Sequence, residues 1–405
     1  MEGAQHKKMK EEQPEKKVGS LGGPYGGGPL VDQVIAPEKS EQKLREAKEI
    51  VGIQPFIDFI YDAEKIALGT YTPLDGFVDS ASFESIVKNN RLPNGLPWTV
   101  PIILAAPEGD ETSEIKEGQE IALLDWDKQP FAIMEVSEKF RYSKEDFANS
   151  LYGTTDPSHP NVYDIFHNYG TTALAGKVHL IRRLELPTVK FELSPKETRE
   201  LFKRKGWKNV VAYQCRNPPH TAHEYIQKVS LENSDIDGLF IQPVIGRLKK
   251  GDYKPPVIME AYRQVVSGYY PKEKAVLSSL SITMRYAGPK AALFYAIVRK
   301  NYGATHYIVG RDQAGVGKFY DPYACHRIFD EFDVGVIPLR YMETFYCRLC
   351  KSMATEKTCP HPSDDHLAIS QTKMRDLLKE GKDLPAEILR PEVIKLLSQG
   401  NVILE

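Results

Sequence analysis

The chain has 405 residues, of which 27% are charged and 41% are hydrophobic, and its formal net charge is -2. This length suffices for two or three domains with cores of their own. The near balance of charges excludes a bulk electrostatic attraction to nucleic acid or to a membrane surface. No apolar run approaches the ~20 residues of a membrane span, and the charged first 17 residues lack the apolar core of a signal peptide, so we expect a cytoplasmic protein.

The N-terminal part divides into a tail and a domain of short apolar runs. Residues 1–28 are charged and then glycine-rich, and we expect a flexible tail there, because such a segment buries too little surface to offset the entropy of ordering. Residues 29–190 contain apolar runs interrupted by proline and glycine, such as 98–104 and 120–124. These runs predict a mostly β domain with some helix, for example at residues 82–89.

From about residue 191 strand-like and helix-like segments alternate. A first helix is expected at 196–205, then strands at 209–213, 238–244, 275–282, 306–309 and 334–338, with helices at 220–232, 257–267, 290–301 and 325–332 between them. This alternation predicts an α/β domain over residues 191–340, a parallel sheet with helices on both faces. Ligands of such sheets bind beyond the carboxyl ends of the strands, where polar clusters follow Tyr213, Ile282 and Val309.

The segment 214–224 follows the first of these strands and opens a helix. Its polar side chains include Gln214, Arg216, Asn217, His220 and His223. A helix N-terminus presents free N–H groups and the positive end of the helix dipole, and the two histidines, three residues apart, share one face. The segment therefore predicts a site for a polyanion such as a nucleotide phosphate. A polar loop with a helix cap is the alternative.

Three other polar segments follow strands of the same predicted sheet. Residues 310–318 carry Arg311 and several glycines, which permit close backbone approach to an oxyanion, although a structural turn is the alternative. Residues 283–290 contain Arg285, which either holds a phosphate or anchors a loop through an ion pair. The basic stretch 246–252 has the pattern of a mobile cover over the site or of a solvated loop.

Three of the five cysteines, Cys347, Cys350 and Cys359, lie within 13 residues, with His361 and His366 close behind. In a long cytoplasmic chain this clustering favours a metal over disulfides. Three cysteines and one histidine complete the tetrahedral shell of zinc and leave no open position, so the zinc would be structural; buried reduced thiols are the alternative. We favour His366 as the fourth ligand, because His361 follows Cys359 by only two residues, with a proline between them.

Together these segments resemble the ATP sulfurylase (sulfate adenylyltransferase) family. Residues 214–223 fit its QxRNPxHxAH motif, residues 310–315 fit its GRDHAG motif except at Gln313, and residues 284–289 match its MRYAGP run. Further similar segments are residues 25–31, residues 73–77 and, in the zinc-containing bacterial and archaeal branch, residues 353–361. The chain ends at Glu405, so we expect no fused adenylylsulfate kinase domain.

The resemblance implies a PUA-like N-terminal domain at 29–190, a Rossmann-like nucleotidyltransferase domain at 191–340 and a small zinc-containing helical lobe at 341–405. The implied reaction converts ATP and sulfate into adenosine 5'-phosphosulfate and pyrophosphate, by direct in-line attack of sulfate on the α-phosphorus. The expected cofactors are structural Zn²⁺ and the Mg²⁺ that accompanies ATP. A homodimer is implied, with neither nucleic acid nor membrane as a partner.

The roles known for the family carry over at the matching positions. The implied sulfate-binding residues are Gln214, Arg216 and Ala314. The implied ATP-binding residues are Gln214, Asn217, His220, His223, Gly310, Arg311, Asp312 and Gly315. The implied catalytic residues are Arg216, Asn217, His220, His223 and Arg311. Three glutamines depart from the family pattern: Gln313 and Gln242 replace histidine, and Gln371 replaces glycine; glutamine keeps a hydrogen bond but cannot carry charge.

Two other functions fit parts of the sequence. One is a different adenylyltransferase, acting on a nucleotide or pantetheine phosphate, since the HxGH motif of such enzymes also places two histidines at the start of a helix. Gln214 and Arg216 favour a small tetrahedral dianion instead. The other is a non-catalytic RNA-binding protein built on the PUA-like domain and the zinc segment. The net charge of -2 and the lack of a basic and aromatic run argue against it.

Overall fold

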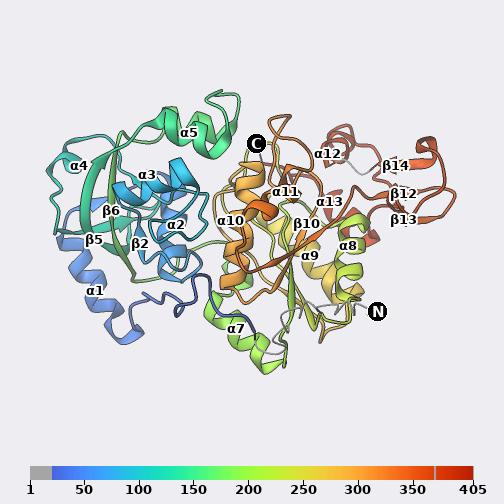
Figure 1. The fold of residues 1–405 in the computed structure, drawn as a ribbon, viewed down its shortest axis with the longest axis horizontal. Helices are drawn as coiled ribbons and strands as arrows, with labels where there is room; N and C mark the ends of the chain where they lie inside the picture. The colour runs from blue at the N-terminus through green and yellow to red at the C-terminus, as the bar shows by residue number, and fades with distance from the viewer. Residues whose placement is uncertain (1–20, 369–370, 405) are drawn as a thin grey trace, which may run out of the picture.

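The computed structural model describes residues 21–368 and 371–404. In Figure 1 the N-terminal domain lies on the left, a second domain built around α10 (Gly288–Asn301) lies in the middle, and a small C-terminal lobe lies on the right. Within the described part of the chain, no helix is both long and apolar enough to cross a bilayer.

The tail predicted for residues 1–28 falls outside the described residues as far as position 20. Beyond it, Tyr25 is buried at 3% exposure. Its backbone N–H donates to Asn301 Oδ1 over 2.9 Å, and its hydroxyl donates to the carbonyl oxygen of Pro97 over 2.6 Å. The residues around Tyr25 are therefore held between the first two domains.

The N-terminal domain is a mixed sheet surrounded by helices. Its strand order is β1-β4-β5-β6-β2, with β3 also paired to β6, and only β1 and β4 run parallel. The strands are β1 (Gly52–Ile53), β2 (Gly76–Phe77), β3 (Leu104–Ala105), β4 (Glu120–Leu124), β5 (Pro130–Arg141) and β6 (Thr172–Leu180). The helices are α1 (Pro37–Glu49), α2 (Ile57–Ala67), α3 (Ser80–Asn89), α4 (Asp110–Glu114), α5 (Lys144–Tyr152) and α6 (Pro160–His167). The domain carries more helix than its apolar runs indicated.

The middle domain is a five-stranded parallel sheet in the order β11-β10-β7-β8-β9. The strands are β7 (Val210–Tyr213), β8 (Gly238–Ile241), β9 (Ala275–Leu277), β10 (His306–Val309) and β11 (Ile337–Arg340). Besides α10, its helices are η1 (Val189–Phe191), α7 (Pro195–Arg204), α8 (Thr221–Leu231), α9 (Pro255–Tyr269) and α11 (Ala324–Glu331). All residues of β7 and β8 are buried, as expected for strands covered on both faces, and the predicted α/β class is confirmed.

The strand order places a crevice between β7 and β10. The chain starts at β7, proceeds to β8 and β9 on one side, and then crosses to β10 and β11 on the other side. At such a reversal the loops that leave the two central strands run in opposite directions, which opens a binding site at their carboxyl ends. The segments 214–224 and 310–318 follow these two strands.

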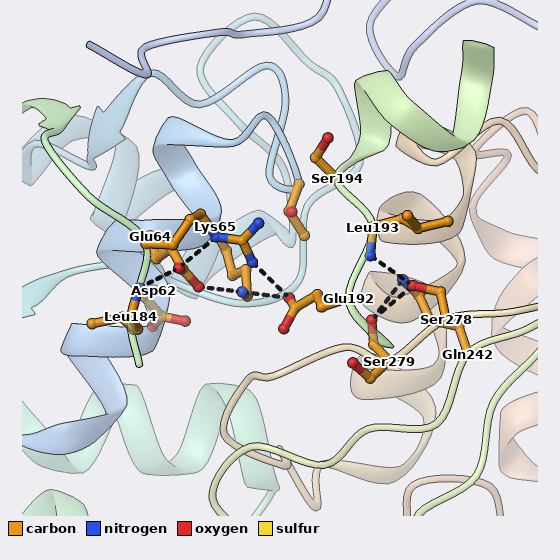
Figure 2. A network of polar contacts seen from close by, with 12 residues as sticks. Asp62, Glu64, Lys65, Leu184, Glu192, Leu193, Ser194, Gln242, Ser278 and Ser279 are labelled. Carbon is orange, nitrogen blue, oxygen red and sulfur yellow. Dashed lines mark hydrogen bonds and ion pairs between the residues drawn. The ribbon is translucent and has the colours of Figure 1, made fainter. Parts of the chain in front are cut away.

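A buried charge cluster joins the N-terminal domain to the linker that enters the middle domain. Lys65, on α2, is fully buried, and its Nζ lies 2.5 Å from both Glu64 Oε2 and Glu192 Oε1. Arg183 Nε donates to Glu64 Oε1 over 2.8 Å. Figure 2 shows Glu192 of the linker reaching Lys65. The next residue, Leu193, donates its backbone N–H to Ser278 Oγ, which directly follows β9 of the middle domain. The pairing of opposite charges is what makes such burial of charge tolerable.

A second junction settles the role of Arg285. Its Nη2 lies 2.5 Å from Asp62 Oδ2 on α2, and both side chains are buried, so the ion-pair alternative is the correct one. Arg247, in the basic stretch 246–252, likewise places Nη1 2.9 Å from Asp58 Oδ1 and 2.8 Å from Asp164 Oδ2. The stretch is thus bound to the N-terminal domain through Arg247.

The C-terminal lobe is a small antiparallel sheet followed by two helices. The strand order is β13-β12-β14, formed by β12 (Phe345–Cys347), β13 (Ser352–Ala354) and β14 (His366–Ala368), with η2 (Ser363–Asp365) before the last strand. The helices are α12 (Gln371–Lys379) and α13 (Pro391–Leu397), of which α13 packs on α9. Positions 369 and 370 of the segment that contains Gln371 lie outside the described residues.

Candidate active site and metal centre

A cavity of about 260 Å³ lies at the carboxyl ends of β7 and β10. The predicted site residues in its lining are Gln214, Arg216, Asn217, His220, His223, Gly310, Arg311, Asp312 and Ala314. Gly315 is absent from the lining. It lies against Asp312, because a Cβ atom at position 315 would be 2.2 Å from Asp312 Oδ1. Two segments almost 100 residues apart in sequence therefore form the walls of one cavity.

His220 is the N-terminal cap of α8. Its Nδ1 accepts the backbone N–H of His223 over 3.4 Å, so in the neutral ring the proton resides on Nε2. The two imidazole rings stack with centroids 3.5 Å apart. Burial, together with the neighbouring His223, holds the pKa of His220 well below its ordinary value. His220 is therefore a neutral hydrogen-bond donor at pH 7.

Cys215 lines the cavity beside His223, with Sγ 3.7 Å from His223 Nε2. The backbone N–H of Asn217 also donates to this sulfur over 3.3 Å. Burial alone would raise the pKa of the Cys215 thiol, but the His223 ring and these hydrogen bonds outweigh it and lower the pKa to about 6. The motif does not indicate this pair, because Cys215 occupies its unspecified position.

Arg216 is held between an aromatic ring and a carboxylate. Its guanidinium carbon lies 4.9 Å from the centroid of the Tyr286 ring, and its Nε lies 3.8 Å from Asp252 Oδ2. Asp252 is 1% exposed and also binds the Tyr286 hydroxyl over 3.0 Å and Arg375 Nη1 over 2.7 Å. The sequence pattern of the stretch 246–252 fitted a mobile cover or a solvated loop, and neither interpretation predicted a buried carboxylate beside Arg216.

The loop after β10 has an unusual backbone. Asp312 and Ala314 have φ angles of 52° and 56°, in the left-handed region that non-glycine residues rarely adopt. The carbonyl oxygen of Ala314 accepts the N–H of Gly288 over 3.0 Å, which ties the loop to α10. Burial raises the pKa of Asp312, against the opposing effect of Arg216 and Arg311. Arg311 is 44% exposed and places Nε 3.4 Å from Glu343 Oε2.

Gln313, one of the three departures from the family pattern, braces this loop. Its Oε1 accepts the N–H of Gly310 over 3.1 Å, and its Nε2 donates to the Tyr307 hydroxyl over 2.5 Å. The Tyr307 hydroxyl in turn donates to Gln214 Oε1 over 3.3 Å. Tyr307 is a second residue that the sequence did not reveal, because it lies inside an apolar strand.

The other two departures lie outside the cavity lining. Gln242 is fully buried and donates from Nε2 to the carbonyl oxygen of Ser279 over 3.3 Å, as Figure 2 shows. The backbone carbonyl oxygen of Gln242 accepts from Arg299 Nη2 over 2.9 Å. Gln371 is the first residue of α12.

A second cluster, in the C-terminal lobe, fits a zinc ion. Ligand atoms of Cys347, Cys350, Cys359 and His361 all lie within 4.8 Å of one another. The sulfurs of Cys350 and Cys359 are 3.8 Å apart, and His361 Nδ1 lies 3.4, 3.2 and 3.7 Å from the three sulfurs. Zinc at ~2.3 Å from each sulfur in a tetrahedron separates the sulfurs by ~3.8 Å. The donor set and its spacing therefore suit a closed, structural zinc site.

The structure brings His361, and not the expected fourth ligand His366, into this cluster. His366 lies on β14, where its ring stacks on Phe345 with centroids 3.6 Å apart. The short span from Cys359 to His361 is no obstacle, because the turn through Pro360 brings His361 Nδ1 back towards the sulfurs.

Comparisons with known proteins agree with this arrangement. A family model described as ATP-sulfurylase matches residues 189–400, and one described as a PUA-like domain matches residues 23–183. A solved structure described as a hexameric APS kinase from Thiobacillus denitrificans shares the fold, with a TM-score of 0.72 and 24% identity. The match covers 94% of this chain and 68% of that one.

Two curated relatives are similar over most of their length. A sulfate adenylyltransferase of Pyrococcus abyssi is 45% identical over 372 residues, which are 92% of this chain and 96% of that protein. A sulfate adenylyltransferase of Hyperthermus butylicus is 44% identical over 372 residues, which are 92% of this chain and 94% of that protein. The resemblance inferred from the sequence motifs is confirmed, and the chain belongs to the ATP-sulfurylase family.

Proposed function

We propose that this protein transfers the adenylyl group of ATP to sulfate and releases pyrophosphate. The observation that carries the proposal is the single cavity into which Gln214, Arg216, His220 and His223 converge from β7 and α8. Its opposite wall is the loop that contains Arg311. A site for one anion would need fewer donors than this cavity offers. The donors lie on two facing walls, which suits two anionic reactants.

We assign the sulfate to Gln214 and Arg216, helped by the backbone of Ala314. Arg216 suits this role because the guanidinium is a permanent, planar donor that pairs with tetrahedral oxyanions, and the Tyr286 ring limits its motion. Its buried Nε makes no hydrogen bond with the described groups of the protein.

We assign the ATP phosphates to Asn217, His220 and His223 at the start of α8, with Gly310, Arg311, Asp312 and Gly315 on the facing loop. The neutral His220 would donate from Nε2, and the positive end of the helix dipole would add to the attraction. Mg²⁺ would enter with the nucleotide, bound through its phosphates.

The chemistry that these groups support is a direct in-line displacement. Sulfate is fully ionised at neutral pH, so attack on the α-phosphorus requires no general base. The obstacle is the mutual repulsion of two anions, which Arg216 and Arg311 would offset while the cavity holds the reactants in line. His220 and His223 would stabilise the charge that builds up on the departing pyrophosphate.

The test is pyrophosphate release from ATP with and without sulfate, compared between the native protein and Arg216→Ala. We expect sulfate-dependent release by the native protein and its loss in the variant. Arg45→Ala, which removes an exposed arginine of α1, is the control and should retain activity. Retained activity in Arg216→Ala would contradict the assignment, and release that depends on a nucleotide or pantetheine phosphate instead of sulfate would contradict the proposed reaction.

We also propose Zn²⁺ as the ion of the cysteine and histidine site, where it would hold the C-terminal lobe together. The homodimer and the cytoplasmic location stay predictions. Sedimentation equilibrium of the purified protein tests the first of them.

A further inference from the structure

A row of hydrogen bonds connects the loop after β10 to Gln214. It runs from the backbone N–H of Gly310 to Gln313 Oε1, from Gln313 Nε2 to the Tyr307 hydroxyl, and from that hydroxyl to Gln214 Oε1, over 3.1, 2.5 and 3.3 Å. Gln214 and Gln313 line the cavity, and Tyr307 is fully buried behind them. The row thus begins at the backbone and ends at a side chain assigned to sulfate.

The direction of every bond in this row is fixed by its first member. A backbone N–H can only donate, so the group of Gln313 that faces it is the carbonyl oxygen, and the Gln313 amide nitrogen must face Tyr307. The tyrosine oxygen accepts from that nitrogen and keeps its own proton for donation. Within residues 21–368 and 371–404, the acceptor in contact with this proton is Gln214 Oε1.

Tyr307 remains a donor over the whole physiological pH range. Burial raises the pKa of its hydroxyl above the ordinary value, although the nearby Arg299 acts in the opposite direction. Gln214 alone could present either its oxygen or its nitrogen to the cavity, because its amide ends have nearly the same shape. With Oε1 bound to Tyr307, the nitrogen is the end left for a ligand.

We propose that Tyr307 and Gln313 are positioning residues that fix the Gln214 amide as a donor and thereby select sulfate over hydrogen phosphate. The inference rests on the proposed function. Gln214 and Arg216 then offer donors only, and sulfate offers acceptors only. Hydrogen phosphate is similar in size and charge but carries a hydroxyl, which would lose its partner at such a site.

The carboxylates that line the same cavity do not supply that missing acceptor on the sulfate side. Asp312 Oδ1 lies over its own loop, where a Cβ atom at position 315 would be 2.2 Å away. The carboxylate of Glu343 pairs with Arg311, Nε to Oε2 being 3.4 Å. Asp252, which lies outside the cavity lining, is committed to Tyr286 and Arg375.

Three substitutions distinguish an effect on the orientation of the Gln214 amide from an effect on side-chain packing. Tyr307→Phe removes the hydroxyl and leaves the ring. Gln313→Glu is isosteric but accepts at both ends, so the Tyr307 proton would turn towards the new carboxylate and release Gln214. Gln313→His is the matched control, because a neutral imidazole accepts at Nδ1 and donates at Nε2, and thus keeps the direction of the row. The same reasoning explains how glutamine can stand where the family motif has histidine.

The measurement is the KM for sulfate, the KM for ATP and the inhibition constant of inorganic phosphate against sulfate. In Tyr307→Phe and Gln313→Glu we expect the ratio of the phosphate inhibition constant to the sulfate KM to fall by about tenfold, the effect of one hydrogen bond to a charged group, with little change in the KM for ATP. Gln313→His should keep the ratio of the native protein.

An unchanged ratio in both Tyr307→Phe and Gln313→Glu, or equal losses for sulfate and ATP, would overturn the inference. Should Tyr307→Phe fail to fold, Gln313→Glu alone decides, since it changes no volume. Absence of sulfate-dependent pyrophosphate release in the native protein is a different result, which would remove the proposed function itself.

Discussion

At the scale of single residues, neighbours decide the charge of the side chains that line the cavity. His220 is kept neutral by burial and by the adjacent His223, whereas the thiol of Cys215 is brought to a pKa of about 6 by the same His223 ring. A bound polyphosphate would meet donors at this site whose protonation differs from that of free imidazole and free thiol. The type of residue was predictable from the motif, but its charge was not.

The lowered pKa of His220 predicts a pH-dependent stability. In the unfolded chain this ring takes up a proton at about pH 6.5, but in the folded protein it does so only at lower pH. Between these values the unfolded state binds more protons, so the free energy of unfolding falls as the pH drops below about 6.5. The contribution is about 1 kcal/mol between pH 7.5 and 5.5.

Urea unfolding of the native protein and of His220→Asn at these two pH values checks this expectation. Asparagine keeps an acceptor for the N–H of His223 but does not titrate. The variant should therefore lose less stability on acidification than the native protein. Parallel losses in the two proteins would show that His220 titrates normally in the folded state.

At the scale of elements, the strands of the C-terminal lobe have only a very small apolar core between them. The strands β12, β13 and β14 have three residues each, and the apolar cluster between them consists of Phe345, Cys347 and Ala354 with Cys359 beside it. So small a core supplies little of the free energy of folding, and a metal site commonly supplies the rest. A metal ion bound by Cys347, Cys350, Cys359 and His361 would therefore also hold the strands together.

Zinc content distinguishes the two histidines. His361→Ala should lower the metal bound per chain from about one ion towards none, because the fourth ligand is lost. His366→Ala should keep the metal, since the imidazole of His366 packs on Phe345 instead. The measurement is metal analysis of the purified variants, and zinc retained in His361→Ala but lost in His366→Ala would reverse this assignment.

At the scale of the whole molecule, buried charges connect the N-terminal domain to the middle one. Helix α2 carries Asp58, Asp62, Glu64 and Lys65, all at 1% exposure or less. Glu64 and Lys65 bind each other, but each of the four also has a partner more than 100 residues away, such as Arg285 for Asp62. Arg285 directly follows Met284, which lines the cavity, so the same pair holds this part of the lining in place.

Replacing one partner of this ion pair should lower the free energy of unfolding more than replacing both partners. Arg285→Met leaves Asp62 buried without a cation, and we expect the free energy of unfolding to fall by about 3–5 kcal/mol. The double variant Asp62→Leu with Arg285→Met removes both charges and should recover much of that loss. Denaturant unfolding of the two single variants and the double variant completes the cycle, with Arg45→Met as an exposed control. Additive effects would show that the two side chains act independently.

The sequence alone determined the elements of the middle domain and the segments that form its site. Buried parallel strands are continuous apolar runs, and the helices between them have their own period, so β7, β8 and β10 could be predicted from local pattern. The predictions for β8 and β9 extended too far, because the apolar residues beyond Ile241 and Leu277 are buried without a continuous ladder. The helix α2 was missed, since its four charged residues are buried together with its apolar face and interrupt the apolar run in the sequence.

The tertiary structure alone decided which groups meet. It placed His361 instead of His366 beside the three cysteine sulfurs, paired Arg285 with Asp62, and placed Tyr307 between Gln313 and Gln214. Hydrogen bonds, ion pairs and metal ligation depend on distances of a few ångströms between atoms that the chain brings together from distant positions. Periodicity and motif spacing describe neighbours along the chain, so they identified the residues of the site but not the partners that orient them.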